Sequence, residues 1–117
     1  MKRMRVEFER GGVFTARLLA DEAPKTCQTI VDSLPFSYRF HQSVVSGQAM
    51  LALLPDLTVE RENQRTVGLL PGSLCFLVQN PAMNVPDELY ISYGLYFVPR
   101  SLAVDAHEPV NTFGTHR

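Results

Sequence analysis

The stretch Met4–Leu19, MRVEFERGGVFTARLL, carries the clearest structural pattern in the chain. Apolar residues at positions 4, 6 and 8 alternate with charged ones, which is the two-residue period of a strand with one buried face. Gly11-Gly12 is a dipeptide typical of a hairpin turn, and Val13–Leu19 has the composition of the returning strand. This stretch therefore predicts an antiparallel β-hairpin.

One helix is predicted after the hairpin, over residues 24–34. Pro24 suits a first helical turn, and Pro35 ends the helix. An apolar stripe runs along one face, with its members spaced i, i+3, i+4 and i+7: Cys27, Ile30, Val31 and Leu34. A helix this short is marginal alone, so we expect it to cap the open end of a sheet or barrel.

The rest of the chain predicts short strands separated by turns. Further strands are expected at Phe36–Val45, Gln48–Leu54, Val67–Leu70, Ser73–Val78, Leu89–Val98 and Val110–Thr115. Gly94, inside one of them, predicts a bulge or a tight bend. We count about eight strands in a single domain, residues 1–117, without repeats or linkers. This pattern favours a mainly β fold, and a closed barrel would leave no sheet edge exposed.

Composition narrows the partners and the compartment. The net charge is −1, so no broad basic field is available for nucleic acid or for acidic lipids. No apolar run approaches the ~20 residues that span a bilayer, and Glu7 and Glu9 interrupt any signal-peptide core. Cys27 and Cys75 form no CxxC pair and are expected to be buried free thiols. We therefore predict a cytoplasmic protein without nucleic-acid or membrane partners.

Several motifs carry a family resemblance. Residues 14–48 resemble the opening of a cyclophilin: Pro24-Lys25-Thr26, then a helix, then Phe40-His41, then Gln48. Four later motifs are similar to small bacterial cyclophilin-like proteins of unassigned function: SGQA (46–49), LLPGSLCF (69–76), ELYISYG (88–94) and PVNTFG (109–114). The resemblance implies a closed cyclophilin-like barrel of about eight strands, capped by the helix at about 24–34. It implies no reaction.

One position departs from true cyclophilins. There, an arginine after the Phe-His pair is the residue that would polarise the prolyl amide. Gln42 occupies that position here, and an amide lacks the fixed positive charge that makes such bonds strong. We therefore expect no prolyl isomerase activity. A peptidyl-prolyl isomerase ranks last of three functional hypotheses, after the two given below.

Four polar residues in the family-like motifs form the candidate ligand site: His41, Ser46, Gln48 and Tyr93. Gly47 allows a ligand close to the backbone, and Ser46 and Gln48 share one face of a regular strand. These residues predict a barrel that binds a small polar or carboxylate-bearing metabolite. The alternatives are a histidine bonded to a backbone carbonyl, a solvent-facing bend and tyrosines in core packing.

The second hypothesis is a protein-interaction or assembly module with a relic peptide groove. Leu89–Val98 has few charges to defend a sheet edge, so we expect a homo-oligomer through this strand. No metal or other cofactor is expected, because His107 and His116 show no ligand spacing with His41. Asn111 is expected at the same barrel end as the Ser46–Gln48 bend. Whether the protein is an enzyme stays open.

Overall fold

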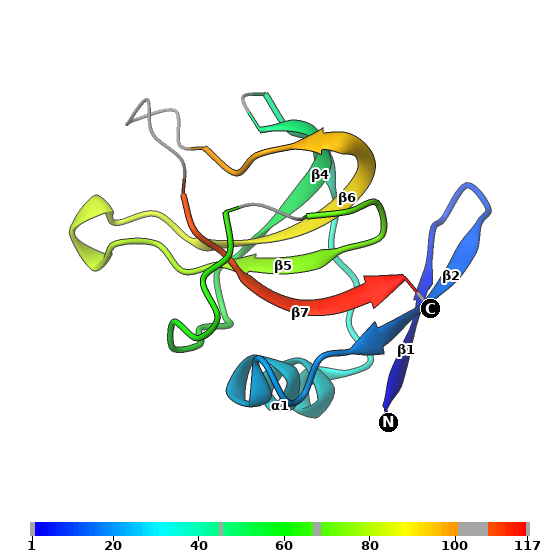
Figure 1. The fold of residues 1–117 in the computed structure, drawn as a ribbon, viewed down its shortest axis with the longest axis horizontal. Coiled ribbons are helices and arrows are strands. Elements are labelled where there is room, and N and C mark those ends of the chain that lie inside the picture. Colours follow the sequence, from blue (N-terminus) through cyan, green and yellow to red (C-terminus); the bar gives the residue numbers. More distant parts are fainter. Residues whose placement is uncertain (1, 45, 67–68, 101–107, 117) are drawn as a thin grey trace.

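The computed structural model describes residues 2–44, 46–66, 69–100 and 108–116. Within them the elements follow in this order: β1 (Arg3–Glu7), β2 (Val13–Leu18), α1 (Pro24–Ser33), β3 (His41–Gln42), β4 (Gly47–Leu54), β5 (Leu74–Leu77), the 3₁₀ turn η1 (Pro81–Met83), β6 (Asp87–Phe97) and β7 (Asn111–His116). The fold is mainly β with one α-helix, as predicted (Figure 1). His107 and part of the predicted strand Val67–Leu70 lie outside the described residues.

The seven strands form one antiparallel sheet in the order β1-β2-β7-β5-β6-β4-β3. The sheet curls into a half-barrel, and α1 lies beside the end formed by β2 and β7 (Figure 1). The Cys27 thiol donates to the carbonyl of Phe113 in β7, at 3.4 Å. The helix therefore packs on the sheet through Cys27 and Ile30 of the predicted stripe, whereas Leu34 lies beyond the end of the helix and is exposed.

The prediction of a closed barrel is wrong. Within the described ranges, β1 pairs only with β2 and β3 pairs only with β4, so the two ends of the sheet do not meet. The predicted strand Phe36–Val45 is reduced to the two residues of β3. Residues 36–40 alternate in exposure like a strand but pair with no strand in the described part of the chain. We call the gap between β1 and residues 34–40 the seam.

Strand β5 is buried on both faces. Leu74 and Phe76 join one apolar cluster, which also contains Ile30 of α1. Cys75 and Leu77 join a second cluster on the opposite face. The prediction that this segment is a central strand is confirmed, since all four of its residues are buried.

Both cysteines are free and buried, as predicted. Burial raises the pKa of the Cys75 thiol to about 12, and it also raises the pKa of Cys27. Among the described residues, no helix is long and apolar enough to cross a membrane. The strand predicted to mediate assembly, β6, lies between β4 and β5, but β5 pairs only with residues 88–91 of it, so assembly through this strand stays a prediction.

Candidate functional site

A large bulge interrupts the pairing of β4 with β6. Gly47 faces Phe97 and Ala49 faces Ser92, so residues 93–96 lie opposite Gln48 alone. The Gln48 side chain substitutes for the missing backbone partner, because its Oε1 accepts a hydrogen bond from the Tyr96 N–H at 3.2 Å. The prediction of a bulge at Gly94 is confirmed.

Two of the four predicted site residues meet at this bulge, Gln48 and Tyr93. The Tyr93 hydroxyl donates to Oε1 of Gln42 at 2.6 Å, and Nε2 of Gln42 donates to the carbonyl of Gly47 at 3.0 Å. Both ends of the Gln42 amide are therefore engaged. The hydrogen bonds of Gln42, Gln48 and Tyr93 stabilise the bulge and leave few of their polar atoms free for a ligand.

The other two predicted residues, Ser46 and His41, lie apart from this group. Ser46 is buried, and its Oγ accepts from the Arg100 N–H at 2.9 Å. Ser46 therefore fastens the start of β4 to the chain after β6. His41 is exposed on β3, opposite Leu51. Ser46 is buried and precedes the first residue of β4, whereas Gln48 is exposed within β4.

The seam contains a cavity of about 640 Å³ that none of those four residues lines. One wall is β1, with Met4 and Val6 facing inward, and the opposite wall is aromatic: Phe36, Tyr38 and Phe40. The floor is the concave face of the sheet, including Leu74, Ile91 and Phe113. Sequence reasoning missed this site, although both walls show the same alternation of apolar and polar residues.

Charged side chains surround the mouth of the seam cavity: Arg5, Arg10 and Arg39 with Glu7 and Glu9. Arg5 and Glu7 form an exposed ion pair at 2.6 Å. Arg39 has no ion-pair partner among the described residues, and it lies between two aromatic wall residues in the sequence. The mouth therefore carries a small excess of positive charge.

Tyr38 fixes the aromatic wall. Its hydroxyl donates to Oδ1 of Asp56 at 3.0 Å, and its ring packs on Phe36 with centroids 5.1 Å apart. Burial raises the pKa of the Tyr38 hydroxyl, and the neighbouring Asp56 raises it further. The hydroxyl therefore stays protonated at neutral pH and holds residues 36–40 in place beside β4.

A second hollow, of about 620 Å³, lies between α1 and the chain that leads into it. Its lining mixes charged side chains of both signs, such as Lys2, Arg17 and Asp21, with aliphatic side chains. None of its described lining residues is aromatic. It offers a ligand less apolar surface of defined shape than the seam cavity does.

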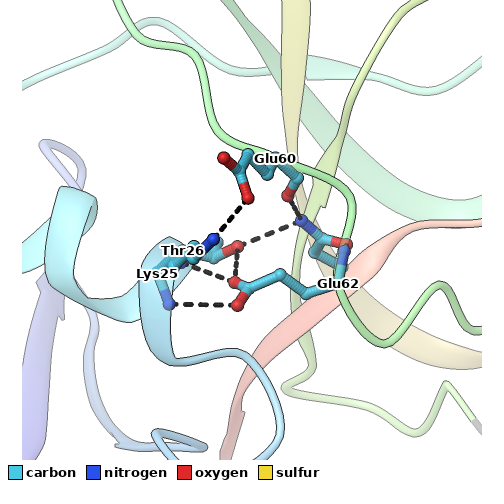
Figure 2. A network of polar contacts seen from close by, with 5 residues as sticks. Lys25, Thr26, Glu60 and Glu62 are labelled. Atoms are coloured by element: carbon cyan, nitrogen blue, oxygen red, sulfur yellow. Dashed lines mark hydrogen bonds and ion pairs between the residues drawn. The ribbon is translucent and has the colours of Figure 1, made fainter.

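A polar network, buried at Thr26 and Asn111, joins α1, residues 60–64 and β7 (Figure 2). The Glu62 carboxylate accepts three hydrogen bonds from the start of α1: from Lys25 N–H at 3.1 Å, Thr26 N–H at 2.7 Å and Thr26 Oγ1 at 2.6 Å. The Lys25 ammonium pairs with Glu60 at 2.5 Å, in an exposed position. Glu62 thus caps a helix whose own N-cap residue, Ala23, supplies no side-chain bond.

Asn111 is the centre of the same network and is fully buried. Its Nδ2 donates to Thr26 Oγ1 at 3.0 Å and to the Glu60 carbonyl at 2.7 Å. Its Oδ1 accepts from the Glu62 N–H at 2.6 Å and from Gln64 Nε2 at 2.7 Å. Asn111 pairs with Phe76 of β5. The bend at Gly47 lies on the far side of Ser92 in the pairing of β4 with β6. Asn111 therefore lies at the opposite end of the sheet from the one predicted.

Two glutamates have pKa values shifted in opposite directions. Partial burial alone would raise the pKa of Glu62, but the hydrogen bonds from Thr26 and Lys25 outweigh it and hold the pKa below 4.5. Burial raises the pKa of Glu88 above 4.5, and its bonds to Tyr90 and Gln79 only partly offset that effect. Neither carboxyl lines the seam cavity, so we assign both to the structure of the protein.

Comparison with known families gives a match over most of the chain. A family model described as "Protein of unknown function (DUF3830)" matches residues 7–107. No curated protein matches the chain.

Proposed function

The chain belongs to the DUF3830 family of proteins of unknown function, and from this premise we propose that its seam cavity binds a small molecule with an apolar body and a carboxylate group. The observation that carries the proposal is the cavity itself, with aromatic and aliphatic walls and arginines at its mouth. Of the ligands expected from the sequence, small polar or carboxylate-bearing metabolites, the proposal keeps the carboxylate-bearing ones, and it moves the site from the bulge to the seam.

Size and chemistry support this ligand class. At about 640 Å³, the cavity lies within the roughly 300–1,000 Å³ typical of ligand sites. Its walls suit a ring or a short chain. Arg39 suits the charged end, because a planar guanidinium binds a carboxylate through two parallel hydrogen bonds. Arg5 is less available, since Glu7 already neutralises it.

Three finer points are part of the proposal. A cyclophilin-like relationship rests on Pro24–Thr26 and Phe40-His41. A cytoplasmic location rests on the two free, buried cysteines, which are typical of reducing compartments. The absence of prolyl isomerase activity is supported by Gln42, whose amide is engaged by Tyr93 and Gly47.

Thermal shift followed by calorimetry, with a panel of aromatic and aliphatic carboxylates and their matched primary amides, tests the proposal. Binding to the native state raises the melting temperature, and a ligand at 100 times its Kd adds about 2.7 kcal/mol of stability. We expect Arg39→Gln to weaken carboxylate binding about tenfold or more while leaving the amides unchanged. Met50→Phe, which fills the cavity floor, should weaken both sets.

Arg17→Gln is the matched control, because it removes the same charge beside the hollow near α1. It should leave binding in the seam unchanged. If no carboxylate binds below millimolar concentration, or if Arg39→Gln and Met50→Phe both leave binding intact, the proposed site is wrong.

A further inference from the structure

We propose that β1 pairs with β1 of a second copy of the chain, antiparallel and with Val6 on the two-fold axis. This inference concerns the free edge of β1 that faces the seam, so a partner strand would lie next to the cavity, and the pairing does not require a ligand there. Three features carry it: the direction of the β1 backbone groups, the order of charges along the strand, and a single register that satisfies both.

The backbone of β1 presents unpaired groups at the seam. Leu18 N–H donates to the Lys2 carbonyl at 2.9 Å, and Phe8 N–H donates to the Gly12 carbonyl at 3.0 Å. Even-numbered residues of β1 therefore direct their backbone groups toward β2. Because these directions alternate along an antiparallel strand, Arg3, Arg5 and Glu7 direct theirs away from the sheet.

Of the features that protect a sheet edge, β1 has charged side chains but neither a proline nor a bulge. The strand pairs with β2 in continuous register. A free edge of this kind accepts another strand unless a protein protects it. In the described part of the chain, residues 36–40 lie across the seam without strand pairing to β1.

The charges of β1 are ordered so that the strand complements itself. Basic Arg3 and Arg5 precede Val6, and acidic Glu7 and Glu9 follow it. The Arg5 and Glu7 side chains are 70% and 58% exposed and pair with each other at 2.6 Å, and in the dimer each would exchange this contact for the oppositely charged residue of the partner copy. An antiparallel copy reverses the order and therefore places acidic residues opposite basic ones.

Only one register satisfies both the backbone and the charges. With Val6 opposite Val6 of the partner copy, Arg5 lies opposite Glu7 twice, and these are residues whose backbone groups point outward. Sliding the partner strand by two residues in one direction would place Arg5 opposite Arg5, and sliding it by two in the other direction would place Glu7 opposite Glu7. Like charges directly opposite each other are destabilising. The interface is isologous, as a closed dimer requires.

Light scattering after size-exclusion chromatography, with the whole chain and without ligand, tests the pairing. We expect a dimer, and we expect Glu7→Arg to raise its dissociation constant about tenfold or more, because two like-charged pairs replace two ion pairs. The exchanged double variant Arg5→Glu/Glu7→Arg should restore dimerisation to within about threefold. Glu60→Arg makes the same charge change far from β1 and should have no effect.

A disulfide provides a second, geometric test. Opposite residues in a non-hydrogen-bonded antiparallel pair have Cα atoms about 4.5 Å apart, within the range that a disulfide spans. Val6→Cys should therefore form an intermolecular disulfide on mild oxidation, whereas Thr15→Cys, exposed on β2, should not. Cys27 and Cys75 are buried and do not compete. A monomeric wild type, a dimer unaffected by Glu7→Arg, or failure of the double variant to restore pairing overturns the proposal.

Discussion

Glu62 supplies the N-terminal cap that the residues at the start of α1 do not provide. Ala23 has no side chain that can accept a hydrogen bond, and the first turn contains no acidic residue. The Glu62 carboxylate binds two N–H groups there and places negative charge at the positive end of the helix. A residue 36 positions away in the sequence thus completes the cap.

Glu62→Gln should destabilise the protein by about 1–2 kcal/mol, the typical loss when a cap is removed. Because the pKa of Glu62 is held below 4.5, its contribution is complete above that pH and is lost as the pH falls through the folded-state pKa. Urea unfolding from pH 7 to 3 measures this. The two proteins should converge in stability at the acid end.

Glu60→Gln is the matched control, since it removes an equally charged neighbour from the exposed Lys25 pair. Exposed pairs contribute about 0–1 kcal/mol, so its effect should be small. Equal losses in the two variants at pH 7 would contradict the capping role of Glu62.

Glu88 should show the opposite pH dependence. Burial raises its pKa, so its protonated form is favoured in the folded state and stability is lost as the pH rises above 4.5. Glu88→Gln stays neutral and should therefore lose less stability than the wild type between pH 4 and pH 7. Chemical unfolding at both pH values checks the sign, and a larger loss in the variant would refute it.

At the scale of elements, Gly47 lets β4 approach the bulge of β6. Its φ is +92°, and an added Cβ would clash with the Tyr96 carbonyl. Gly47→Ala should therefore cost about 3 kcal/mol or more, from backbone strain and overpacking together. Gly11 has a φ of +99° but open space around it, so Gly11→Ala should cost only about 1–2 kcal/mol. Thermal unfolding compares them, and equal losses would show that the contact with Tyr96 is unimportant.

The sequence predicts an element well where local pattern decides it. The helix is predicted at 24–34 and found at Pro24–Ser33, and the bulge is predicted from Gly94. The role of residues 60–64 could not be predicted from local pattern. They form a polar stretch without periodicity, and their role depends on Thr26 and Asn111, which only the folded chain brings near.

At the scale of the whole molecule, the difference between a closed and an open barrel depends on residues 36–40. Their aromatic alternation is typical of a strand, but local pattern cannot say whether a partner strand lies beside them. The seam cavity could not be predicted for the same reason, because its two walls come from segments that are distant in the sequence. The four polar residues of the predicted site were chosen because they occur in family-like motifs. In the folded sheet, Ser46 and His41 lie apart from Gln48 and Tyr93.

Hydrogen exchange should rank the strands by their place in the sheet. The amides of β5, which is buried on both faces and paired on both sides, should exchange only with global unfolding. Those of the two-residue edge strand β3 should exchange at least about 100-fold faster. Arg5 and Glu7 amides should exchange fast at low protein concentration and slow down as the concentration rises. Equal protection across the sheet would contradict the open arrangement.

The polar network of α1 has a consequence for the order in which the chain folds. The groups that satisfy the start of this helix come 36 and 85 residues later in the sequence. Loops of that length close slowly, so the first turn of α1 forms late, after β7 has joined the sheet. Interactions absent from the transition state act on unfolding rates. Stopped-flow measurements should therefore show that Glu62→Gln accelerates unfolding and leaves the refolding rate nearly unchanged.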